Sequence, residues 1–426
     1  MISRVRWNLR GRLRWNPRWK LGAERMQNLK VTAIAFAANK FLVILVSAIA
    51  SRNTWSSRSF FGAIHYILVD NFRYFDADHY VKIATHGYAD LKSTTFFPGY
   101  PLLVKAVSWG LHISALAAGV LISNVAFFLL LYFFLKLALV DYDRLHSRRA
   151  LLLLAFFPTA FYFSAAYTEA TFMLVSVLAL LGMRKERWTR AGLYGGIASA
   201  LRNTGVLLGL PYLIEYWTAH QQKERERIIP PESPSASRQV SPRAGWGPVF
   251  WVLLIGAGAV AYVVYLWLAK GDPLAFAQGQ KAYGRGTGTP WGTLYHGYAY
   301  GLKILVHLHR PLNWTQVYYV SQLFFPTLVV VVLVTSFRKI RWSYWAIILY
   351  SLIVPLLAPA NAAPGLGSSV IDYFVSFSRY SLVIVPLFFG IERLLKRRWA
   401  YWVYLVFSAL FLVLLTYAWS RHKWVA

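Results

Sequence analysis

The side chains of this sequence that could do chemistry are few enough to consider one by one. Cysteine is absent, which excludes thiol nucleophiles, disulfides and thiolate metal sites. Aspartate and glutamate together number 16 among 426 residues. Four of them fall within residues 51–112: Asp70, Asp76, Asp78 and Asp90. Because carboxylates can act as general bases, this segment is the first place to look for acid–base chemistry.

Asp76 is the strongest candidate for a catalytic carboxylate. It lies in the run Tyr74-Phe75-Asp76-Ala77-Asp78-His79-Tyr80, between aromatic side chains. There it could accept the proton of an attacking hydroxyl group, with His79 and Tyr80 as neighbouring substrate-binding candidates. The alternative is that Asp76 caps the helix that follows it. Asp78 is the second candidate, for the base or for binding, although on a helix it would point away from Asp76.

Three further ionisable residues stand at the ends of apolar stretches. Glu169 could bind a sugar hydroxyl, a metal or a cationic partner, or lie in the first turn of a helix where the dipole favours it. Arg202 and Arg379 could bind phosphate oxygens through their planar guanidinium groups, and Tyr380 follows Arg379 directly. The alternative for both arginines is that the side chain extends along an apolar surface toward water.

The elements that must position these side chains are apolar. Hydrophobic residues make up 57% of the chain and charged residues 14%, and the mean hydropathy is +0.43. A soluble domain of this size cannot hide so much apolar surface, so the composition predicts an all-α polytopic membrane protein. Ionisable groups at a membrane boundary are costly unless they are paired or used, which makes each of those named above a functional candidate.

The net charge of +29 does not indicate nucleic-acid binding. Lys and Arg gather in short stretches between apolar runs, which is typical of the cytoplasmic loops of membrane proteins. A basic surface interleaved with aromatic residues, as in a nucleic-acid-binding module, is not apparent. Residues 1–30 hold nine Lys or Arg and one Glu, so we expect the N-terminus in the cytoplasm.

The order of basic and apolar segments predicts about eleven transmembrane helices. The first is expected over residues 31–50. Further spans are expected near residues 113–139, 150–166, 169–183, 246–269, 314–336, 342–357, 379–391 and 399–418. The apolar stretch 191–217 is interrupted by Arg202-Asn203-Thr204-Gly205, which predicts two half-helices with Arg202 at their outer tip.

This order divides the chain into four parts. We expect a basic cytoplasmic N-terminus over residues 1–30 and a catalytic transmembrane module over 31–218, whose extracytoplasmic segment, 51–112, contains amphipathic helices. A flexible cytoplasmic loop is expected over 219–245. A second transmembrane module, 246–426, follows with an extracytoplasmic segment at 270–313. No soluble catalytic domain is expected, so the outer segments and the membrane cavity beneath them must hold the site.

Two other patterns carry little chemical information. The stretch Gly284–Thr289 does not match the phosphate-binding P-loop pattern, and we interpret it as a flexible loop over the site. His307 and His309 are two residues apart and would diverge on a helix, so no dedicated metal site is expected. No cofactor is required by the sequence, and a divalent cation is left open.

Several runs together resemble the signature of PIG-V-type mannosyltransferases, which belong to the GT-C superfamily of membrane glycosyltransferases. The resemblance spans about residues 30–390, and Phe75 stands where the family usually has Trp. The runs that carry it are Phe75-Asp76-Ala77-Asp78-His79-Tyr80, Phe96-Phe97-Pro98-Gly99-Tyr100-Pro101, Ser164-Ala165-Ala166-Tyr167-Thr168-Glu169, Arg202-Asn203-Thr204-Gly205 and Gly271-Asp272-Pro273-Leu274-Ala275-Phe276. The last of these resembles bacterial members in particular.

The resemblance implies a GT-C-type helix bundle and an inverting transfer of a sugar, typically mannose. The donor would be a polyprenyl-phosphate sugar, and the acceptor a hydroxyl of a lipid-linked or glycan molecule at the outer face of the cell membrane. Asp76 would deprotonate the acceptor, and Arg202 and Arg379 would stabilise the departing phosphate. The expected substrate-binding residues are Asp78, His79, Tyr80, Glu169, Arg202, Arg379 and Tyr380.

Other functions are compatible with a polytopic chain of this kind. A transporter or flippase for a lipid-linked sugar would also contain intramembrane charges, but such proteins commonly show internal repeats with matching broken helices. A protein O-mannosyltransferase or an aminoarabinose-type transferase of the same superfamily would differ in its acceptor. Their first outer segment usually carries an Asp-Glu pair, which residues 51–112 lack. The expected partners are the donor, the acceptor and membrane lipids, without nucleic acid.

Overall fold

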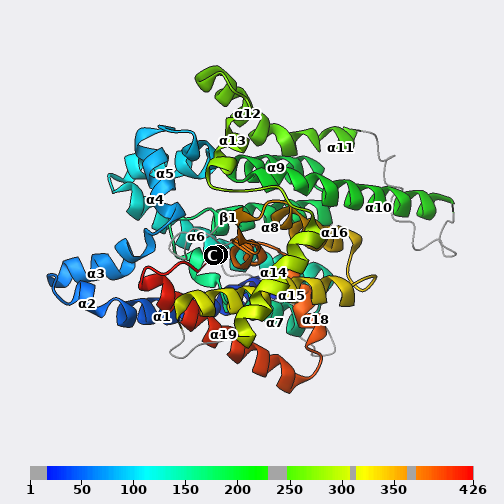
Figure 1. Ribbon diagram of the computed structural model, residues 1–426. Helices are drawn as coiled ribbons and strands as arrows, with labels where there is room; N and C mark the ends of the chain where they lie inside the picture. Colours follow the sequence, from blue (N-terminus) through cyan, green and yellow to red (C-terminus); the bar gives the residue numbers. More distant parts are fainter. Residues whose placement is uncertain (1–16, 229–246, 308–312, 362–370, 426) are drawn as a thin grey trace, which may run out of the picture.

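Long apolar helices dominate the structure, a computed structural model that describes residues 17–228, 247–307, 313–361 and 371–425 (Figure 1). Within these ranges, five helices are long and apolar enough to cross a membrane. They are α1 (Pro17–Ala50), α6 (Ala115–Asp141), α12 (Leu253–Lys270), α15 (Trp314–Thr335) and α19 (Arg398–Ser420). Phe41, Leu268 and Leu410 on these helices stay largely exposed, as expected of surfaces solvated by lipid. The all-α polytopic fold is thus confirmed, whereas the count of about eleven spans stays a prediction.

The first expected outer segment consists of short helices. They are α2 (Arg52–Trp55), α3 (Phe60–Leu68), η1 (Asp70–Phe72), α4 (Asp76–His86), η2 (Lys92–Thr95) and α5 (Gly99–Leu111). Helix α4 is amphipathic: it buries Ala77, Tyr80 and Ala84 on one face and leaves Lys82 exposed. This face packs against α5 and α6, which fixes the direction of the residues at the start of α4.

The middle of the chain contains two interruptions in apolar sequence. Its elements are α7 (Arg144–Ala155), η3 (Ala160–Phe163), α8 (Glu169–Arg184), α9 (Trp188–Leu201), η4 (Asn203–Leu208), α10 (Gly209–Ile228) and α11 (Gly247–Phe250). The predicted span at 150–166 is wrong, because α7 ends at Ala155 and a buried, largely non-helical segment follows. Pro158 accounts for this end, since proline disfavours the helical conformation of the residue before it.

The predicted interruption at Arg202 is present. Helix α9 ends at Leu201, and Arg202 has extended backbone angles (φ −151°, ψ 144°) before η4 begins. Gly205 is required for this turn, because a Cβ atom there would lie 2.3 Å from the carbonyl carbon of Ala198. Gly99 is equally constrained, since its Cβ would lie 2.8 Å from the carbonyl oxygen of Ala200. Gly205 thus lets η4 fold back against α9, and Gly99 lets the start of α5 pack directly against the end of α9.

The C-terminal part is also irregular near the centre of the molecule. Its elements are α13 (Ala275–Ala282), α14 (Pro290–Val306), α16 (Trp342–Leu356), β1 (Ala360–Asn361), β2 (Ile371–Asp372), α17 (Phe377–Leu382) and α18 (Leu387–Leu394), with β1 and β2 antiparallel. The predicted span at 379–391 is wrong as a single helix, because it divides into α17 and α18. Pro386 lies at the division and caps α18.

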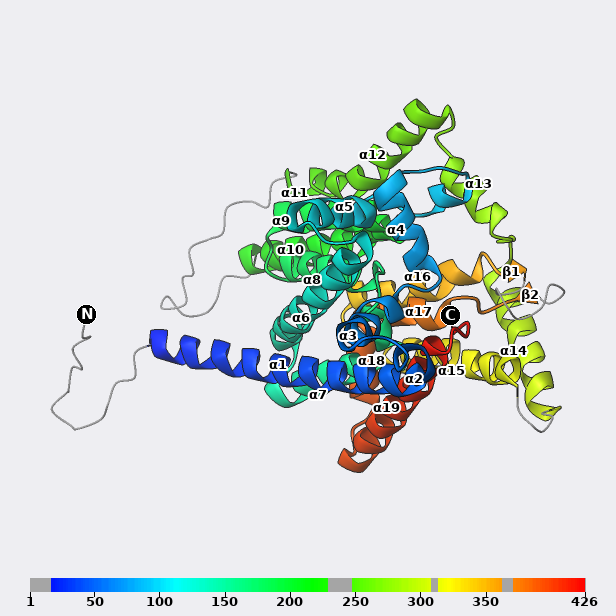
Figure 2. The same ribbon diagram turned by 90° about the vertical axis from the view of Figure 1, so that its left-hand side faces the viewer.

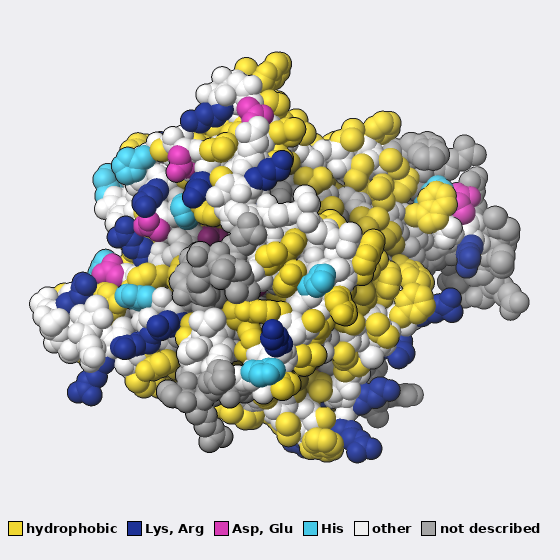
Figure 3. Space-filling model, viewed as in Figure 1, with side chains coloured by type: hydrophobic (Ala, Val, Ile, Leu, Met, Phe, Trp, Pro, Cys, Tyr) yellow, Lys and Arg dark blue, Asp and Glu magenta, His cyan; other side chains and the backbone are white. Residues whose placement is uncertain are grey.

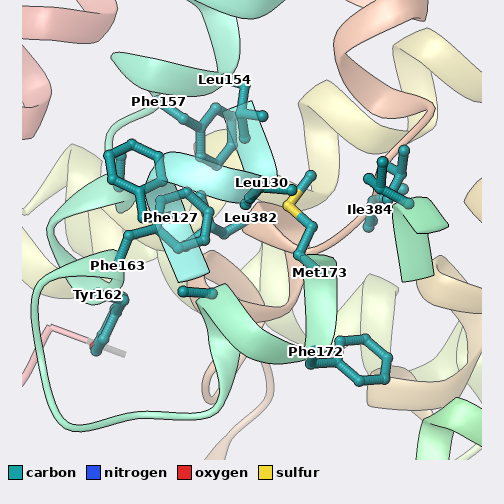
Figure 4. Packing of buried hydrophobic residues seen from close by; sticks show 14 of the residues in the cluster. Phe127, Leu130, Leu154, Phe157, Tyr162, Phe163, Phe172, Met173, Leu382 and Ile384 are labelled. Carbon is teal, nitrogen blue, oxygen red and sulfur yellow. The ribbon is translucent and has the colours of Figure 1, made fainter. Parts of the chain in front are cut away.

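The core joins the two predicted modules. Figure 4 shows Phe127 of α6 beside Phe163, with Met173 of α8 and Leu382 of α17 nearby. The rings of Phe127 and Phe163 are stacked with centroids 4.7 Å apart. Figure 2 shows the start of α1 and the end of α10 at one end of the molecule, and α13, α14 and the β1–β2 pair at the other. Most of the predicted basic N-terminus and flexible loop, and His309, lie outside the described residues.

Candidate active site

One cavity brings together segments from both halves of the chain. It has a volume of about 610 Å³. Six of the eight candidate site residues line it: Asp76, His79, Tyr80, Arg202, Arg379 and Tyr380. On the face shown in Figure 3, charged and histidine side chains gather over the part occupied by α2–α5 and α13, and hydrophobic side chains cover much of the remainder.

A network of two carboxylates and two arginines, here called the cavity cluster, stands at this cavity. Its members are Asp76, Glu169, Arg202 and Arg379. Arg379 pairs with Asp76 (Nη1–Oδ2, 2.5 Å) and with Glu169 (Nε–Oε1, 2.6 Å), and Arg202 also pairs with Glu169 (Nη1–Oε1, 2.8 Å). The arginines therefore do not extend toward water: their side chains are only 10% and 8% exposed.

Glu169 holds both arginines from the first residue of α8. It is completely buried and does not itself line the cavity. Its Oε2 has no hydrogen-bond partner within the described residues, and the contact with Arg379 Nε lacks hydrogen-bond alignment. The predicted first-turn position is present, but Thr168 makes no side-chain cap. The cavity cluster is thus balanced in charge and incomplete in hydrogen bonding.

Asp76 is the more accessible carboxylate of the cavity cluster. Its side chain is 23% exposed, and only Oδ2 is engaged, by Arg379. Within the described residues Oδ1 has no hydrogen-bond partner, so it is available to a ligand. The alternative that Asp76 caps α4 is wrong, because Asp76 is the first helical residue and Phe75 occupies the cap position.

The backbone beside Asp76 is held in an uncommon conformation. Phe75 has a φ of 59°, which is costly for a residue with a side chain. The hydroxyl of Tyr167 secures this turn: it accepts a bond from the Asp76 N–H (3.1 Å) and donates to the Tyr74 carbonyl (3.1 Å). Trp424 closes the other side, with its ring centroid 5.0 Å from that of Phe75. Strain of this kind is typical of functional sites.

His79 and Tyr80 line the wall next to Asp76. The His79 ring stacks on Phe96 with centroids 4.9 Å apart, and its Nε2 lies 3.1 Å from the hydroxyl of Tyr283. Tyr80 is buried and reaches Thr168 with its hydroxyl (3.5 Å). Both side chains can therefore contact a molecule that approaches Asp76, and Tyr283 is a neighbour that the sequence interpretation missed.

Asp78 does not join the other candidates. It forms ion pairs with Arg73 (2.9 Å) and Lys82 (2.6 Å) and is not among the residues that line the cavity. Burial alone would raise the pKa of Asp78, but the hydrogen bonds from Lys82 and Arg73 outweigh it, so the pKa is lowered. Asp76 and Asp78 thus differ in position although they share one helical turn: Asp76 lines the cavity and Asp78 does not.

Arg285 is a cavity residue that the sequence interpretation missed. The stretch Gly284–Thr289 was expected to be a flexible loop, but Arg285 forms a β-bridge with Ala360, and the Gly286 N–H donates to the Pro359 carbonyl (2.8 Å). The side chain of Arg285 lines the cavity and points a nitrogen at the hydroxyl of Tyr380 (3.5 Å). An arginine among glycines in a predicted outer segment was the available signal.

No cluster in the described part of the chain is built to hold a metal. Groups of three or more His, Asp or Glu side chains close enough to share an ion do not occur there. A divalent cation that took part would need other ligands, such as phosphate oxygens of a substrate, which Mg²⁺ often accepts.

The first half of the chain is similar to known mannosyltransferases. Residues 40–218 match the family model described as Mannosyltransferase (PIG-V). GPI alpha-1,6-mannosyltransferase 2 of Homo sapiens is 29% identical over 33% of this chain and 30% of its own length. The Mus musculus protein of that name is 32% identical over 33% and 30%, and GPI mannosyltransferase 2 of Drosophila pseudoobscura pseudoobscura is 32% identical over 33% and 34%. The chain thus matches about a third of the length of these relatives.

The matched region and the cavity overlap only in part. Asp76, Glu169 and Arg202 lie within residues 40–218, whereas Arg285 and Arg379 lie beyond them. The cavity cluster is therefore composed of one part from the segment similar to PIG-V mannosyltransferases and one part from a segment that the family model does not cover.

Proposed function

We propose that this protein is a membrane mannosyltransferase of the GT-C type that uses a polyprenyl-phosphate sugar as donor. The observation that carries the proposal is the composition of the cavity. Asp76 and three arginines line it together with apolar side chains of α8, η4 and α16, among them Phe172, Leu208 and Ile347. A carboxylate, cations and an apolar wall are what a hydroxyl acceptor, a phosphate and a prenyl chain require.

The transfer would proceed as a single displacement. Asp76 Oδ1 takes the proton of the acceptor hydroxyl, whose oxygen attacks C1 of the sugar. The bond between C1 and the phosphate oxygen breaks, and the electron pair leaves with the polyprenyl phosphate. The configuration at C1 is inverted, and negative charge that develops on the phosphate meets the positive wall of the cavity.

The proposed residue roles follow from position in the cavity. His79, Tyr80 and Tyr283 form the wall beside Asp76 and would bind sugar or acceptor hydroxyls. Tyr380 lies between Arg202 and Arg285, so it would contact the phosphate side of the donor. Glu169 would act through Arg202 and Arg379, because it is buried behind them.

We place the site on the extracytoplasmic side of the cell membrane. The cavity cluster contains the first residue of α8, and the basic stretch Arg184–Arg190 begins at the last. Basic loops favour the cytoplasm, so the opposite end of α8 would face outward. A bacterial glycolipid, polysaccharide or protein hydroxyl is the acceptor class we favour. The catalytic module 31–218 and the second module 246–426 would then both contribute to the site.

The proposal is tested by transfer assays with the full chain in lipid nanodiscs. Polyprenyl-phosphate mannose with labelled sugar would be supplied together with candidate glycolipid and glycan acceptors, with and without EDTA. We expect a new glycosidic product from the wild type and almost none from Asp76→Asn. Asp70→Asn is the matched control, because Asp70 lies in the same outer segment but pairs with Arg58 and His65 away from the cavity.

Two results would contradict the proposal. Full transfer by Asp76→Asn would show that Asp76 is not the general base. For the same protein in sealed proteoliposomes, movement of labelled lipid across the bilayer without any new glycosidic bond would instead identify a transporter.

A further inference from the structure

The formal charges at the cavity do not cancel. The cavity cluster contains two carboxylates and two arginines, and its three ion pairs connect all four side chains. Arg285 lines the same cavity and forms no ion pair within the described residues. The five side chains therefore leave one formal positive charge, and Arg285 is the member without an anionic partner.

The hydrogen-bond partners of Arg285 within the described residues are neutral groups. Its Nη1 donates to the Ala358 carbonyl (3.1 Å), and its Nη2 lies 3.5 Å from the Tyr380 hydroxyl. Since a guanidinium group has five N–H donors, these two contacts leave most of them free for an anion. Arg202 and Arg379, in contrast, already donate to carboxylates, so their positive charges are partly compensated before any phosphate binds.

The backbone under Arg285 is fixed. Gly284 takes a φ of 74°, and the following residues run alongside the segment after α16. Gly286 donates to the Pro359 carbonyl (2.8 Å) and Gly288 to the Leu357 carbonyl (2.9 Å). A side chain on such a support is positioned in advance, which lowers the entropy lost when a ligand is bound.

Tyr380 connects this residue to the cavity cluster. Its hydroxyl faces Arg285, and the guanidinium carbon of Arg202 lies 5.5 Å from the centre of its ring. An anion held by Arg285 would thus lie beside Arg202 while the ion pairs of Arg202 and Arg379 remain intact.

We propose that Arg285 is the principal ligand of the lipid phosphate, both in the polyprenyl-phosphate sugar and in the polyprenyl phosphate that leaves. Arg202 and Arg379 then serve mainly to hold Glu169 and Asp76 in place. This inference rests on the proposed function, because it assigns a ligand to the donor of that reaction.

The test compares binding of polyprenyl phosphate and of the uncharged polyprenol with the same chain, each to the full protein in nanodiscs. The ratio of the two affinities isolates the phosphate from the prenyl contacts and tolerates a partial loss of folded protein. We expect the wild type to prefer the phosphate, and Arg285→Gln to lose about 10- to 100-fold of that preference, as for a charged hydrogen-bonding partner. Arg285→Lys should keep part of it, because lysine retains the charge but not the planar fork.

Arg58→Gln is the matched control, since Arg58 pairs with Asp70 and does not line the cavity, and its ratio should equal that of the wild type. An undiminished preference in Arg285→Gln, with the wild type preferring the phosphate, would overturn the inference and leave the proposed function standing. A wild type that does not distinguish the two lipids would overturn both.

Discussion

Two networks of buried charge stand at opposite ends of α8. The cavity cluster includes Glu169, the first residue of the helix, and a second network includes Arg184, the last. This second network, here called the far cluster, consists of Asp141, Arg184, Glu215 and Arg341. At 1.5 Å per residue the 16 residues of α8 separate the two by roughly 22 Å.

The two clusters have the same composition and differ in how completely they are bonded. In the far cluster, Arg341 binds both oxygens of Glu215 (2.8 and 2.9 Å), and the hydroxyls of Ser343 and Tyr344 donate to Glu215 and Asp141. Within the described residues, the cavity cluster leaves Glu169 Oε2 and Asp76 Oδ1 without a hydrogen-bond partner, and Asp76 lines a cavity. Two clusters of equal formal charge can therefore differ in function. The carboxylates of the far cluster are hydrogen-bonded and join helices, whereas the cavity cluster leaves Asp76 Oδ1 available to a ligand.

Replacement of the aspartate in each cluster should separate chemistry from stability. Asp76→Asn removes the proposed base, so kcat should fall by about 10³-fold, within the range of general-base effects. Asp141→Asn breaks the pair with Arg184 but touches no ligand, so kcat per folded molecule should stay within about 3-fold of the wild type, because Asp141 plays no part in the displacement. Transfer assays normalised to folded protein from size-exclusion chromatography measure both. Equal losses of kcat in the two variants would contradict the assignment of catalysis to the cavity cluster and of a structural role to the far cluster.

Replacement of the glutamate in each cluster should affect the free energy of unfolding. Glu215→Gln removes the negative charge and one of the two oxygens that accept from Arg341, Arg184 and Ser343, and a broken buried pair costs about 3–5 kcal/mol. Glu169→Gln should cost less, because within the described residues Glu169 accepts one hydrogen bond where Glu215 accepts four, and the second oxygen of Glu169 has no partner. Thermal denaturation of both variants in the same detergent shows which of them is less stable. A larger loss of stability for Glu169→Gln would contradict the expectation that the far cluster contributes more to the free energy of unfolding.

Asp372 extends the comparison to a buried carboxylate that belongs to neither cluster and has no ion pair within the described residues. Burial raises its pKa to about 6, although bonds from the Tyr318 hydroxyl (2.7 Å) and the Phe374 N–H oppose this. The unfolded pKa is about 3.9, so the folded protein binds the proton more tightly. Its contribution to stability is then full below about pH 4 and lost as the pH rises to about 6, by at most roughly 3 kcal/mol.

The difference in unfolding free energy between the wild type and Asp372→Asn, measured from pH 4 to 7, checks this sign. The asparagine variant lacks the titrating group, so the wild type should lose stability relative to it as the pH rises. A flat difference over this range would contradict the elevated pKa.

The smallest effect is expected at Asp78. Its ion pairs with Arg73 and Lys82 are partly exposed, and such pairs contribute about 0.2–1 kcal/mol. Asp78→Asn should therefore change the free energy of unfolding by less than about 1 kcal/mol and leave kcat within about 3-fold of the wild type, because Asp78 takes no proton in the proposed displacement. A loss of transfer comparable to that of Asp76→Asn would show that the second aspartate of the turn also faces the substrate.

The sequence predicted the long apolar helices well and the short irregular ones poorly. Helices α6, α15 and α19 lie within a few residues of their predicted ranges, because hydropathy alone defines them. The spans expected at 150–166 and 379–391 were wrong, because a hydropathy average does not register Pro158 or Pro386. In both places the broken helix borders the site, where non-helical backbone is tolerated by burial in protein.

The candidate site was predicted as separate residues and not as an arrangement. Asp76, Glu169, Arg202 and Arg379 were each chosen for an ionisable group at the end of an apolar stretch. Their pairing joins positions as far apart as 303 residues, which a single sequence does not reveal. Arg285 was missed for the same reason: its importance depends on which carboxylates the other arginines already occupy.

The shared pairing of Glu169 has a consequence for turnover. By neutralising one of the three positive charges at the cavity, this carboxylate would limit the electrostatic attraction for the polyprenyl phosphate released in the proposed reaction. Each further unit of positive charge in a site of low dielectric would lengthen the residence time of that product. In the proposed reaction, a buried residue that does not line the cavity would thereby set how soon the product leaves and the next donor can bind.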